Sequence, residues 1–335
     1  MKKIVFLLIT LFLFSGCNLE KNEIKKEKNI LEKKYTDERF LFGTYIQMIV
    51  FSENKEKAEN AMNAAFKKID ELDSKYNSKS KGSIIYNLNH SKEKEIILDD
   101  EGIELFNGVK EVYNLSNGKY DITISPLLDI WGFGINGREE IPSKEELQEA
   151  LNVIGFDKVT ISNNKLKLKE NIKEIDTGSF LKGYAVQKAK EILEEKGIKN
   201  GFISSISSIA TVNGKVDGSP WRIGVQNPTD LEKILGIIEV KDRALGISGD
   251  YQTYVEIKGK KYHHIMDKST GYPVEDKKLV VVICDSAFYA DMYSTAFFNM
   301  SIENILKKAE ELNIDVLIVD SNEKIVTSKN FELEQ

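Results

Sequence analysis

The chain has 335 residues, of which 41% are hydrophobic and 30% charged, so it can bury a sizeable core as one large domain or two small ones. The 47 Lys and Arg residues against 53 Asp and Glu residues give a net charge of −6, with both signs spread along the chain. No basic stripe is present, which argues against the class of nucleic-acid-binding proteins.

The N-terminal segment is typical of an export signal. Lys2 and Lys3 precede an apolar run over residues 4–14, which is too short to span a bilayer and has the length of a signal-peptide core. The run ends in Ser15-Gly16-Cys17, which resembles a bacterial lipobox and implies cleavage before Cys17 and lipid attachment to its sulfur. The alternative is an ordinary secretion signal in which Cys17 has no role. We expect a lipoprotein signal peptide over 1–16 and anchoring at the extracytoplasmic face of the bacterial cell membrane.

Residues 17–38 have the composition of a solvated tether, because Lys, Glu and Asn dominate and apolar residues are few. A single folded domain is expected over 39–335, since no linker rich in Pro, Gly or Ser interrupts it. If Cys17 carries lipid, Cys284 has no partner for an intrachain disulfide. Cys284 ends the apolar run 279–284, where a small buried hydrophobe is favoured over a reactive thiol.

The first half of the expected domain mixes helices with short strands. Residues 44–51 have strand composition, and apolar side chains then recur at helical spacing over 55–72. A polar loop over 73–83 follows, and a second helix is predicted over 101–115. Later elements are a helix to residue 153 opened by a Ser143–Glu146 capping box, a hairpin of 159–162 with 165–168, and a glycine-punctuated turn into a helix ending at Gly197.

Short strands dominate the second half. They are predicted over 201–206, 209–212, 221–226, 234–240, 244–247, 252–257, 261–265, 279–284 and 316–319, with helices around Asp291 and over 303–312. Mixed helices and short, mainly antiparallel strands predict the α+β class, as a compact unit of mixed sheets with packed helices.

Two groups of polar residues in this half indicate chemistry. Asp291 and Thr295 stand four apart in a helical segment, so their side chains project from one face. A carboxylate and a hydroxyl together form a hard oxygen half-site of the kind that Mg²⁺ accepts. His263 and His264 are two of the three histidines in the chain, and Asp267 follows them closely.

Eight blocks of the sequence together resemble one family, the ApbE-type FAD:protein FMN transferases. In chain order the blocks are FGT (42–44), LDSKYNSKSKGSIIYNLN (72–89), NGKYDITISPLLDIWGFG (117–134), IDTGSFLKGYAV (175–186), PWRIGVQNP (220–228), ISGDY (247–251), HHIMDKSTGYPV (263–274) and ADMYSTAFF (290–298). They follow the family order and span nearly the whole chain after the tether. The resemblance implies a compact α+β unit with FAD in a cleft.

The resemblance implies a reaction in which FAD is split at its pyrophosphate. FMN passes to a Thr or Ser hydroxyl of an exported acceptor protein, and AMP leaves. Such a transfer needs neutralised phosphate charge and an in-line hydroxyl, which implies Mg²⁺ as cofactor and FAD as substrate. Two alternatives remain open: an FAD pyrophosphatase, in which water replaces the acceptor hydroxyl, and a non-catalytic flavin-binding lipoprotein.

The resemblance also implies roles for single residues. Asp291 and Thr295 match the family's metal-ligand pair, and the main-chain carbonyl of Ser179 completes the protein's share. His264 matches the family's histidine, to which we assign the base or proton relay for the acceptor hydroxyl, with His263 as the weaker candidate. A merely hydrogen-bonded histidine is the alternative for His264. The positions that match flavin or nucleotide contacts are Phe42, Tyr76, Lys119, Tyr120, Asp121, Asp176, Lys182 and, through its backbone, Ile265.

Simpler structural roles compete with these assignments. Asp291 can be a carboxylate favoured at a helix N-terminus, and Thr295 can bond the backbone of its own helix. Trp131 and Phe133 are expected in the core, because WGFG is typical of a tight, packed turn. Tyr76 falls in a polar loop, so a contact with the flavin is favoured over core packing.

Two blocks depart from the family pattern. The usual Gly-Gly-x-Ala-Lys-Gly turn is Gly178-Ser179-Phe180-Leu181-Lys182-Gly183 here, and serine in place of glycine restricts a positive φ. A Gly-Gly-Asn that normally follows a strand is replaced by Ile206-Ser207-Ser208. Both departures bear on how the cleft accepts FAD, and both leave the metal pair and His264 unchanged.

Overall fold

The computed structural model describes residues 32–134 and 137–335. The predicted signal peptide, Cys17 and most of the predicted tether lie outside the described residues. The folded part starts at Lys33 rather than near Arg39, since β1 (Lys33–Leu41) pairs along its whole length with β2 (Thr44–Ser52). β1 is an edge strand with many exposed polar side chains, which concealed it in the sequence.

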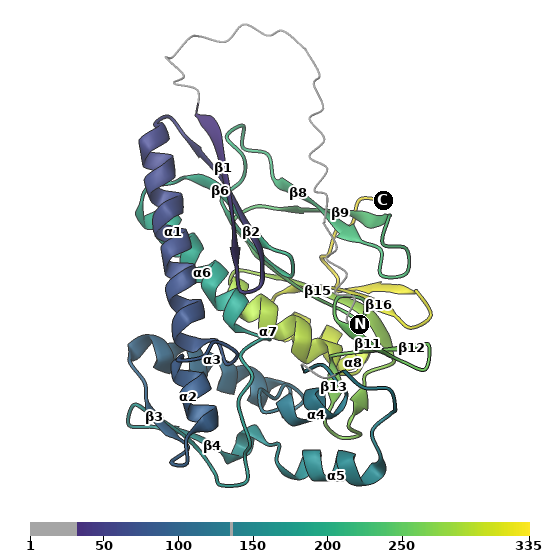
Figure 1. The fold of residues 1–335 in the computed structure, drawn as a ribbon. Coiled ribbons are helices and arrows are strands. Elements are labelled where there is room, and N and C mark those ends of the chain that lie inside the picture. Colours follow the sequence, from purple (N-terminus) through teal and green to yellow (C-terminus); the bar gives the residue numbers. More distant parts are fainter. Residues whose placement is uncertain (1–31, 135–136) are drawn as a thin grey trace, which may run out of the picture.

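An eight-stranded sheet forms the centre of the molecule (Figure 1). Its strand order is β1-β2-β6-β7-β10-β15-β16-β17, and every neighbouring pair is antiparallel. The further strands are β6 (Asn200–Ser205), β7 (Ser208–Val212), β10 (Ala244–Gly249), β15 (Lys277–Cys284), β16 (Asp315–Asp320) and β17 (Ile325–Thr327). Five of these match predicted strands closely, whereas β17 was not predicted.

The helices carry most of the chain's remaining core. They are α1 (Lys55–Tyr76), α2 (Ile84–His90), α3 (Asp100–Leu115), α4 (Ser125–Ile130), α5 (Lys144–Asn152), α6 (Leu181–Glu195), α7 (Ala287–Phe298) and α8 (Ile302–Leu312), with a 3₁₀ turn over Phe156–Lys158. The predicted capping box of α5 is present in full. The short helices α2 and α4 were not predicted.

The large sheet is covered on both faces. Helices α6 and α7 pack on one face, with α1 against α6 and β2 (Figure 1). On β15, Val280 and Val282 belong to this helix-side core, whereas Leu279 and Val281 belong to a second core on the opposite face. That second core is closed by the two-stranded ribbon of β8 (Trp221–Gln226) and β9 (Ile234–Val240).

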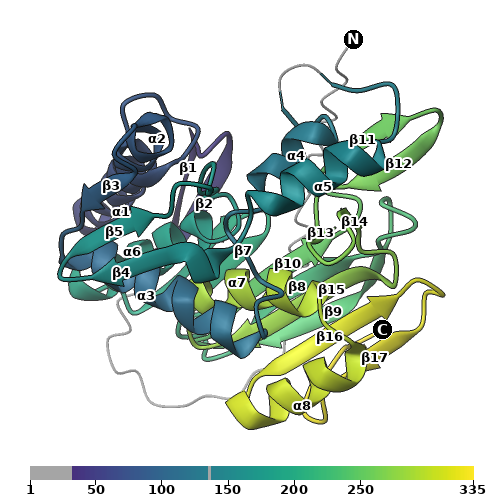
Figure 2. The same cartoon turned by 90° about the horizontal axis from the view of Figure 1, so that it is seen from below.

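Three smaller sheets complete the fold. One holds β3 (Glu95–Ile97), β5 (Lys165–Leu168) and β4 (Val159–Ser162), and two hairpins pair β11 (Tyr254–Ile257) with β12 (Lys260–His263) and β13 (Met266–Asp267) with β14 (Tyr272–Pro273). Figure 2 shows α4 and α5 beside β11 and β12, where they share a third core. The predicted α+β class is confirmed.

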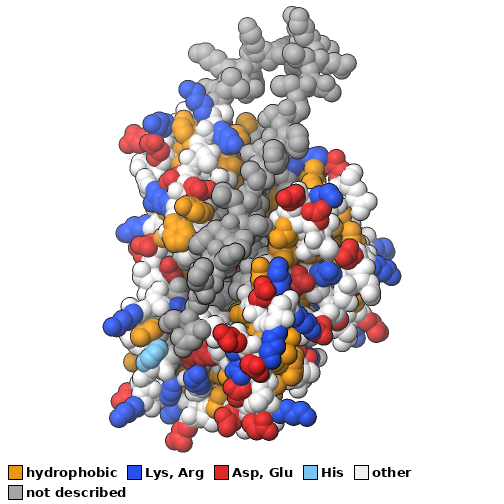
Figure 3. All heavy atoms as spheres, turned by 45° about the vertical axis from the view of Figure 1, so that its right-hand side comes forward, with side chains coloured by type: hydrophobic (Ala, Val, Ile, Leu, Met, Phe, Trp, Pro, Cys, Tyr) orange, Lys and Arg blue, Asp and Glu red, His pale blue; other side chains and the backbone are white. Residues whose placement is uncertain are grey.

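Charged side chains of both signs are interspersed on the surface that Figure 3 presents. Among the described helices, none combines the length and the apolar character that crossing a bilayer requires. Cys284 is buried, and burial raises the pKa of its thiol to about 11, which confirms the predicted role as a small hydrophobe.

Candidate active site

Helix α7 presents the predicted metal pair. It is apolar around most of its circumference and packs between α6 and the sheet. Two glycines make this packing close: a Cβ on Gly246 of β10 would lie 2.0 Å from the carbonyl oxygen of Ala290, and one on Gly183 of α6 would lie 2.4 Å from Cβ of Asp291. Asp291 is 6% exposed in consequence, and Thr295 lies one turn further along the same helix.

The Asp291 carboxylate caps a neighbouring helix. Its Oδ2 accepts a hydrogen bond of 3.0 Å from the backbone N–H of Gly183, in the first turn of α6, and α6 has no side-chain cap of its own. Asp291 therefore caps the N-terminus of α6. The simpler structural role had instead placed this carboxylate at the N-terminus of its own helix, α7. Burial raises the pKa of Asp291 to about 6, an effect that Lys182, Ser208 and the Gly183 N–H partly offset.

A group of hydroxyls surrounds this carboxylate. Ser248 Oγ of β10 lies 2.8 Å from Ser294 Oγ and 3.3 Å from Thr295 Oγ1. Thr295 reaches the main-chain oxygen of Asp291 only at 3.5 Å, so its bond to its own helix is weak. Ser208 Oγ of β7 is fully buried and makes no hydrogen bond of ordinary geometry in the described chain, although its interaction with the Asp291 carboxylate lowers the pKa of that group.

This donor set fits a hard cation. The described residues contain no group of three or more His, Cys, Asp or Glu side chains that could hold a metal ion. A cation held by Asp291 and Thr295 would use one carboxylate together with neutral oxygens, a donor set that suits Mg²⁺ better than a softer metal. The buried Ser208 hydroxyl, which makes no hydrogen bond of ordinary geometry and lies beside the Asp291 carboxylate, is consistent with an oxygen-lined cation site here.

The turn before α6 keeps an ordinary backbone despite its serine. Neither Gly178 nor Ser179 has a positive φ, so the substitution of glycine by serine is accommodated without strain. Tyr120 is 2% exposed, and its hydroxyl lies 3.0 Å from Ser179 Oγ, so Tyr120 contacts this turn from the protein interior. Burial raises the pKa of Tyr120 well above its ordinary value.

The hairpin between β6 and β7 holds the second departure, and here the backbone is strained. Ile206 has a φ of 53°, a left-handed conformation that is unfavourable for a β-branched residue. Its side chain is 44% exposed, so little packing compensates for this cost.

The two adjacent histidines differ in their bonding. His263 is buried, with Nε2 on the carbonyl of Val274 and Nδ1 on the N–H of Ile265, so both ring nitrogens are occupied. His264 uses only Nδ1, which lies 3.1 Å from the carbonyl of Thr253. Because a carbonyl can only accept, that nitrogen carries the proton and Nε2 keeps a lone pair.

The surroundings of His264 favour the neutral ring. Desolvation lowers its pKa to about 4, the Thr253 carbonyl opposes this shift, and the charge of Lys182 adds to it. Lys182 has no ion pair or hydrogen bond in the described chain beyond these charge interactions. Asp176 lies nearby and is held by the N–H of Gly178 at 2.7 Å. The predicted residues His264, Lys182, Asp176 and Asp291 are therefore brought together.

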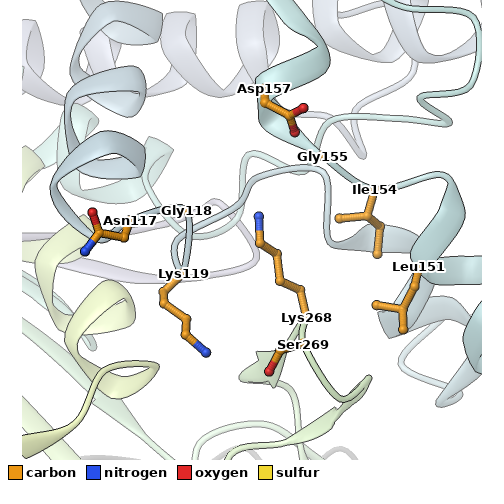
Figure 4. A pocket seen from close by; sticks show the side chains of 9 residues that line it. All are labelled: Asn117, Gly118, Lys119, Leu151, Ile154, Gly155, Asp157, Lys268 and Ser269. Carbon is orange, nitrogen blue, oxygen red and sulfur yellow. The ribbon is translucent and has the colours of Figure 1, made fainter.

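Lys119 lines a cavity of about 400 Å³ next to this group (Figure 4). Its ammonium lies 3.3 Å from Asp267, and Lys268 extends into the same cavity from another segment. Of the residues predicted as site residues, Lys119 alone lines this cavity. The cavity therefore does not contain the other residues predicted for the reaction centre.

The prediction for Tyr76 is wrong. Helix α1 extends one turn beyond the predicted end, so Tyr76 is its last residue and not part of a loop. The side chain has no exposed surface, and its hydroxyl donates to Asp99 at 2.8 Å. A ring buried in this way cannot lie along a flavin.

The prediction for Asp121 is also wrong. Its carboxylate side chain is 1% exposed and accepts hydrogen bonds from the N–H and hydroxyl of Thr123, the N–H of Phe156 and the ammonium of Lys268. No acceptor capacity faces a cleft, because the carboxylate joins three segments of the chain.

At two positions predicted to contact the flavin, Ile265 and Phe42, main-chain groups already make hydrogen bonds within the chain. The N–H of Ile265 donates to His263, and its carbonyl accepts from Val274, so the predicted backbone contact of Ile265 is not supported. Phe42 occupies the β1–β2 turn with a φ of 54°, and its N–H donates to Asp73. Its side chain is half-buried, and a contact with the flavin stays a prediction.

The aromatic pair of the WGFG turn lies in the core as expected. Trp131 is fully buried, and its Nε1 donates to the carbonyl of Gly271 at 2.8 Å. Phe133 packs beside the same cluster, with its ring centroid 6.4 Å from that of His264.

Sequence reasoning assigned no supporting role to the residues that hold the site in place. Gly246, Ser248 and Thr253 were missed, and Gly183 and Ser208 were noted only as parts of the two blocks that depart from the family pattern. A glycine inside a helical pattern, as at Gly183, signals close packing and was the available clue. The serines and Thr253 act through pairings between distant strands, which a single sequence does not reveal.

Comparisons with known proteins agree with this architecture. The model of the ApbE family matches residues 42–318. The FAD:protein FMN transferase of Vibrio cholerae is 29% identical over 271 residues, covering 79% of this chain and 81% of that protein. The FAD:protein FMN transferase of Buchnera aphidicola is 28% identical, covering 94% of this chain and 92% of that protein. The crystal structure of the ApbE protein of Thermotoga maritima superposes with a TM-score of 0.82 at 28% identity, covering 89% and 97% of the two chains.

Proposed function

Because this chain belongs to the ApbE family, we propose that it transfers FMN from FAD to a Thr or Ser hydroxyl of an exported acceptor protein, with Mg²⁺ as cofactor and AMP as the second product. One observation carries the proposal: the Asp291 carboxylate accepts a hydrogen bond from the N–H of Gly183, the residue after Lys182, so that the carboxylate and Lys182 both lie at the start of α6. The charge of Lys182 also lowers the pKa of His264. Phosphoryl transfer requires a ligand for a metal ion, a positive charge for the phosphate and a base. Asp291, Lys182 and His264 can supply these three functions.

His264 is suited to take the proton of the acceptor hydroxyl. Its Nδ1 proton is held on Thr253, which leaves the Nε2 lone pair as the acceptor. A pKa near 4 keeps the ring neutral at pH 7, so the lone pair is present in nearly every molecule. Both ring nitrogens of His263 already make hydrogen bonds to the main chain, at Val274 and Ile265, so that this histidine has a structural role.

Asp291, Thr295 and the main-chain carbonyl of Ser179 would hold the cation. When bound, Mg²⁺ supplies neutralisation of the charge on the pyrophosphate oxygens. Lys182 contributes positive charge from the start of α6, whose first-turn N–H groups also favour an anion. Tyr120 holds Ser179 in position through its hydroxyl.

To test the proposed transfer, the protein is incubated with FAD, Mg²⁺ and a membrane fraction that contains exported proteins. We expect flavin fluorescence that stays on an acceptor band after denaturation, together with AMP. Free FMN with AMP and no labelled acceptor would instead identify an FAD pyrophosphatase, and flavin binding without AMP would identify a non-catalytic binding protein.

Asp291→Asn is the decisive variant. Its amide oxygen can still accept from the Gly183 N–H, so the cap of α6 is kept while the charge for the cation is lost. We expect Mg²⁺-dependent AMP release to fall at least 100-fold with little change in melting temperature. Asp217→Asn, at an exposed turn, is the matched control and should retain full activity. AMP release at the unmutated rate in Asp291→Asn would refute the metal assignment.

We also propose that the protein is anchored through lipid on Cys17 at the extracytoplasmic face of the membrane. The lipobox-like Ser15-Gly16-Cys17 after an apolar run supports this location. Labelling with a radioactive fatty acid should mark the wild-type chain and not Cys17→Ser. A wild-type chain without label would contradict the proposal.

A further inference from the structure

The Ser208 hydroxyl is a buried polar group beside the Asp291 carboxylate. Ser208 has no exposed surface, and its Oγ makes no hydrogen bond of ordinary geometry within the described residues, although it interacts with the Asp291 carboxylate and lowers the pKa of that group. Four other buried side-chain atoms of the described chain share this property, on Thr44, Ser125, Gln226 and Asn299. Ser208 differs from them in its position, because it lies next to the carboxylate of Asp291. A buried hydroxyl whose hydrogen-bonding capacity is not fully used costs free energy, and a bound cation would offset that cost.

Strand pairing points the Ser208 side chain at Asp291. Ser208 pairs with Gly246 across the β7–β10 ladder, and directly paired residues of antiparallel strands share one face of the sheet. That face lies under α7, since a Cβ on Gly246 would meet the carbonyl of Ala290 at 2.0 Å and the N atom of Asp291 at 2.6 Å. The lack of a side chain on Gly246 leaves Ser208 as the group beside Asp291.

The same face of the sheet carries a second hydroxyl, that of Ser248, which makes hydrogen bonds. Ser248 is two residues along β10 from Gly246, and its Oγ reaches Ser294 and Thr295 of α7. Ser208 and Ser248 therefore flank Gly246 opposite Asp291 and Thr295. Four oxygen-bearing side chains therefore converge on one place, and two of them, Asp291 and Thr295, belong to the proposed cation site.

We propose that Ser208 is a further oxygen ligand of this cation site, its hydroxyl joining the carboxylate of Asp291 and the hydroxyl of Thr295. The inference rests on the proposed function, which supplies the cation. A hydroxyl is a hard, neutral donor that suits Mg²⁺ without adding charge. The site then has a single negative charge from the protein, so the diphosphate of the substrate is needed for full neutralisation. Cation and dinucleotide are expected to bind cooperatively.

Metal binding tests the proposal without a measurement of turnover. Mn²⁺ serves as the probe, titrated by electron paramagnetic resonance with and without FAD. Ser208→Ala should raise the Mn²⁺ dissociation constant about tenfold or more. Its metal-free melting temperature should change little, because Ser208 makes no hydrogen bond of ordinary geometry. Ser205→Ala is the control: Ser205 is equally buried, and its hydroxyl already donates to the carbonyl of Ser208.

A thiol at the same position separates a ligand from a packing residue. Ser208→Cys should raise the preference for Cd²⁺ over Mg²⁺ by at least tenfold, because a thiolate favours the softer cation. Ser205→Cys should show no such change, and the buried Cys284 is common to all variants. Ser208 is not a ligand if Ser208→Ala binds Mn²⁺ like the wild type, or if Ser208→Cys gains no preference for Cd²⁺.

Asp291→Asn distinguishes a failure of the cation site from a failure of the Ser208 assignment. If the wild type binds Mn²⁺ and Asp291→Asn does not, the cation site stands, and an unaltered Ser208→Ala refutes only the role of Ser208. If Asp291→Asn binds Mn²⁺ as the wild type does, the cation site at α7 is itself refuted.

Discussion

The Tyr76 phenol has no exposed surface, and its hydroxyl donates to the Asp99 carboxylate where α1 meets α3. Tyr76→Phe removes this bond and leaves the ring in place. We expect a loss of about 1–3 kcal/mol in the free energy of unfolding, because the acceptor is charged and the donor is buried. The KM for FAD should not change. Urea unfolding and steady-state kinetics check both values, and a raised KM at unchanged stability would restore the flavin contact.

His264 makes stability and activity depend on pH in a defined direction. The ring has an ordinary pKa of 6.5 when unfolded and one of about 4 in the folded chain, mainly because burial disfavours its charge. The unfolded chain therefore binds more protons between these values, and this group costs stability as the pH falls from about 6.5 to about 4. Above pH 6.5 it has no effect.

His264→Gln isolates this effect. The free energy of unfolding of the wild type relative to His264→Gln should be constant above pH 6.5 and should decrease progressively toward pH 4. His90→Gln, on an exposed helix end, provides the control. The transfer rate of the wild type should show no loss from this histidine until the pH is near 5. A difference between the two chains that does not vary with pH would contradict the lowered pKa.

Ile206 carries backbone strain at the tip of the β6–β7 hairpin. The left-handed conformation is unfavourable for a branched side chain, and glycine adopts it freely. Ile206→Gly should therefore raise the free energy of unfolding by about 1 kcal/mol, because only a half-exposed side chain is lost. Lys258→Gly, at another turn with a positive φ of 50°, should be stabilising for the same reason. A destabilised Ile206→Gly would show that the side chain makes contacts worth more than the strain.

At the scale of elements, Asp121 acts as a junction between three segments. Its carboxylate joins the start of the α4 segment, the turn at Phe156 and the loop at Lys268. Asp121→Ala leaves an ammonium and buried N–H groups without a partner, so we expect a loss of about 3–5 kcal/mol in the free energy of unfolding. Chemical unfolding measures this loss. Asp217→Ala, at an exposed turn, should change stability little, and an equally small effect at Asp121 would refute its role as a junction.

Element boundaries show what the sequence alone can predict. Long periodic segments such as α1 and α3 were predicted well, because their apolar spacing is strong over several turns. The edge strand β1 and the short helices α2 and α4 were not, since each is either polar or too short for its periodicity to be read. The boundary error of one turn at the end of α1 is what misplaced Tyr76.

At the scale of the whole molecule, the fold class and the placement of Asp291 and Thr295 on one helix were predictable, and the contacts around them were not. Asp291 and Thr295 follow from their spacing on one helix, which is local information. The role of Asp121 and the position of Ser208 depend on segments more than 30 residues away in the chain. Such pairings arise from the three-dimensional arrangement of strands and helices, which no local pattern encodes.

The close packing of α7 has a consequence for how the protein would work. With backbone atoms of α6 and β10 almost touching it, the helix cannot slide or tilt without steric overlap. The entropy cost of positioning Asp291 and Thr295 relative to each other is therefore incurred once, during folding, and not in each catalytic cycle. Adaptation to an incoming partner must come from the surrounding loops, so specificity can diverge between relatives while this helix stays the same.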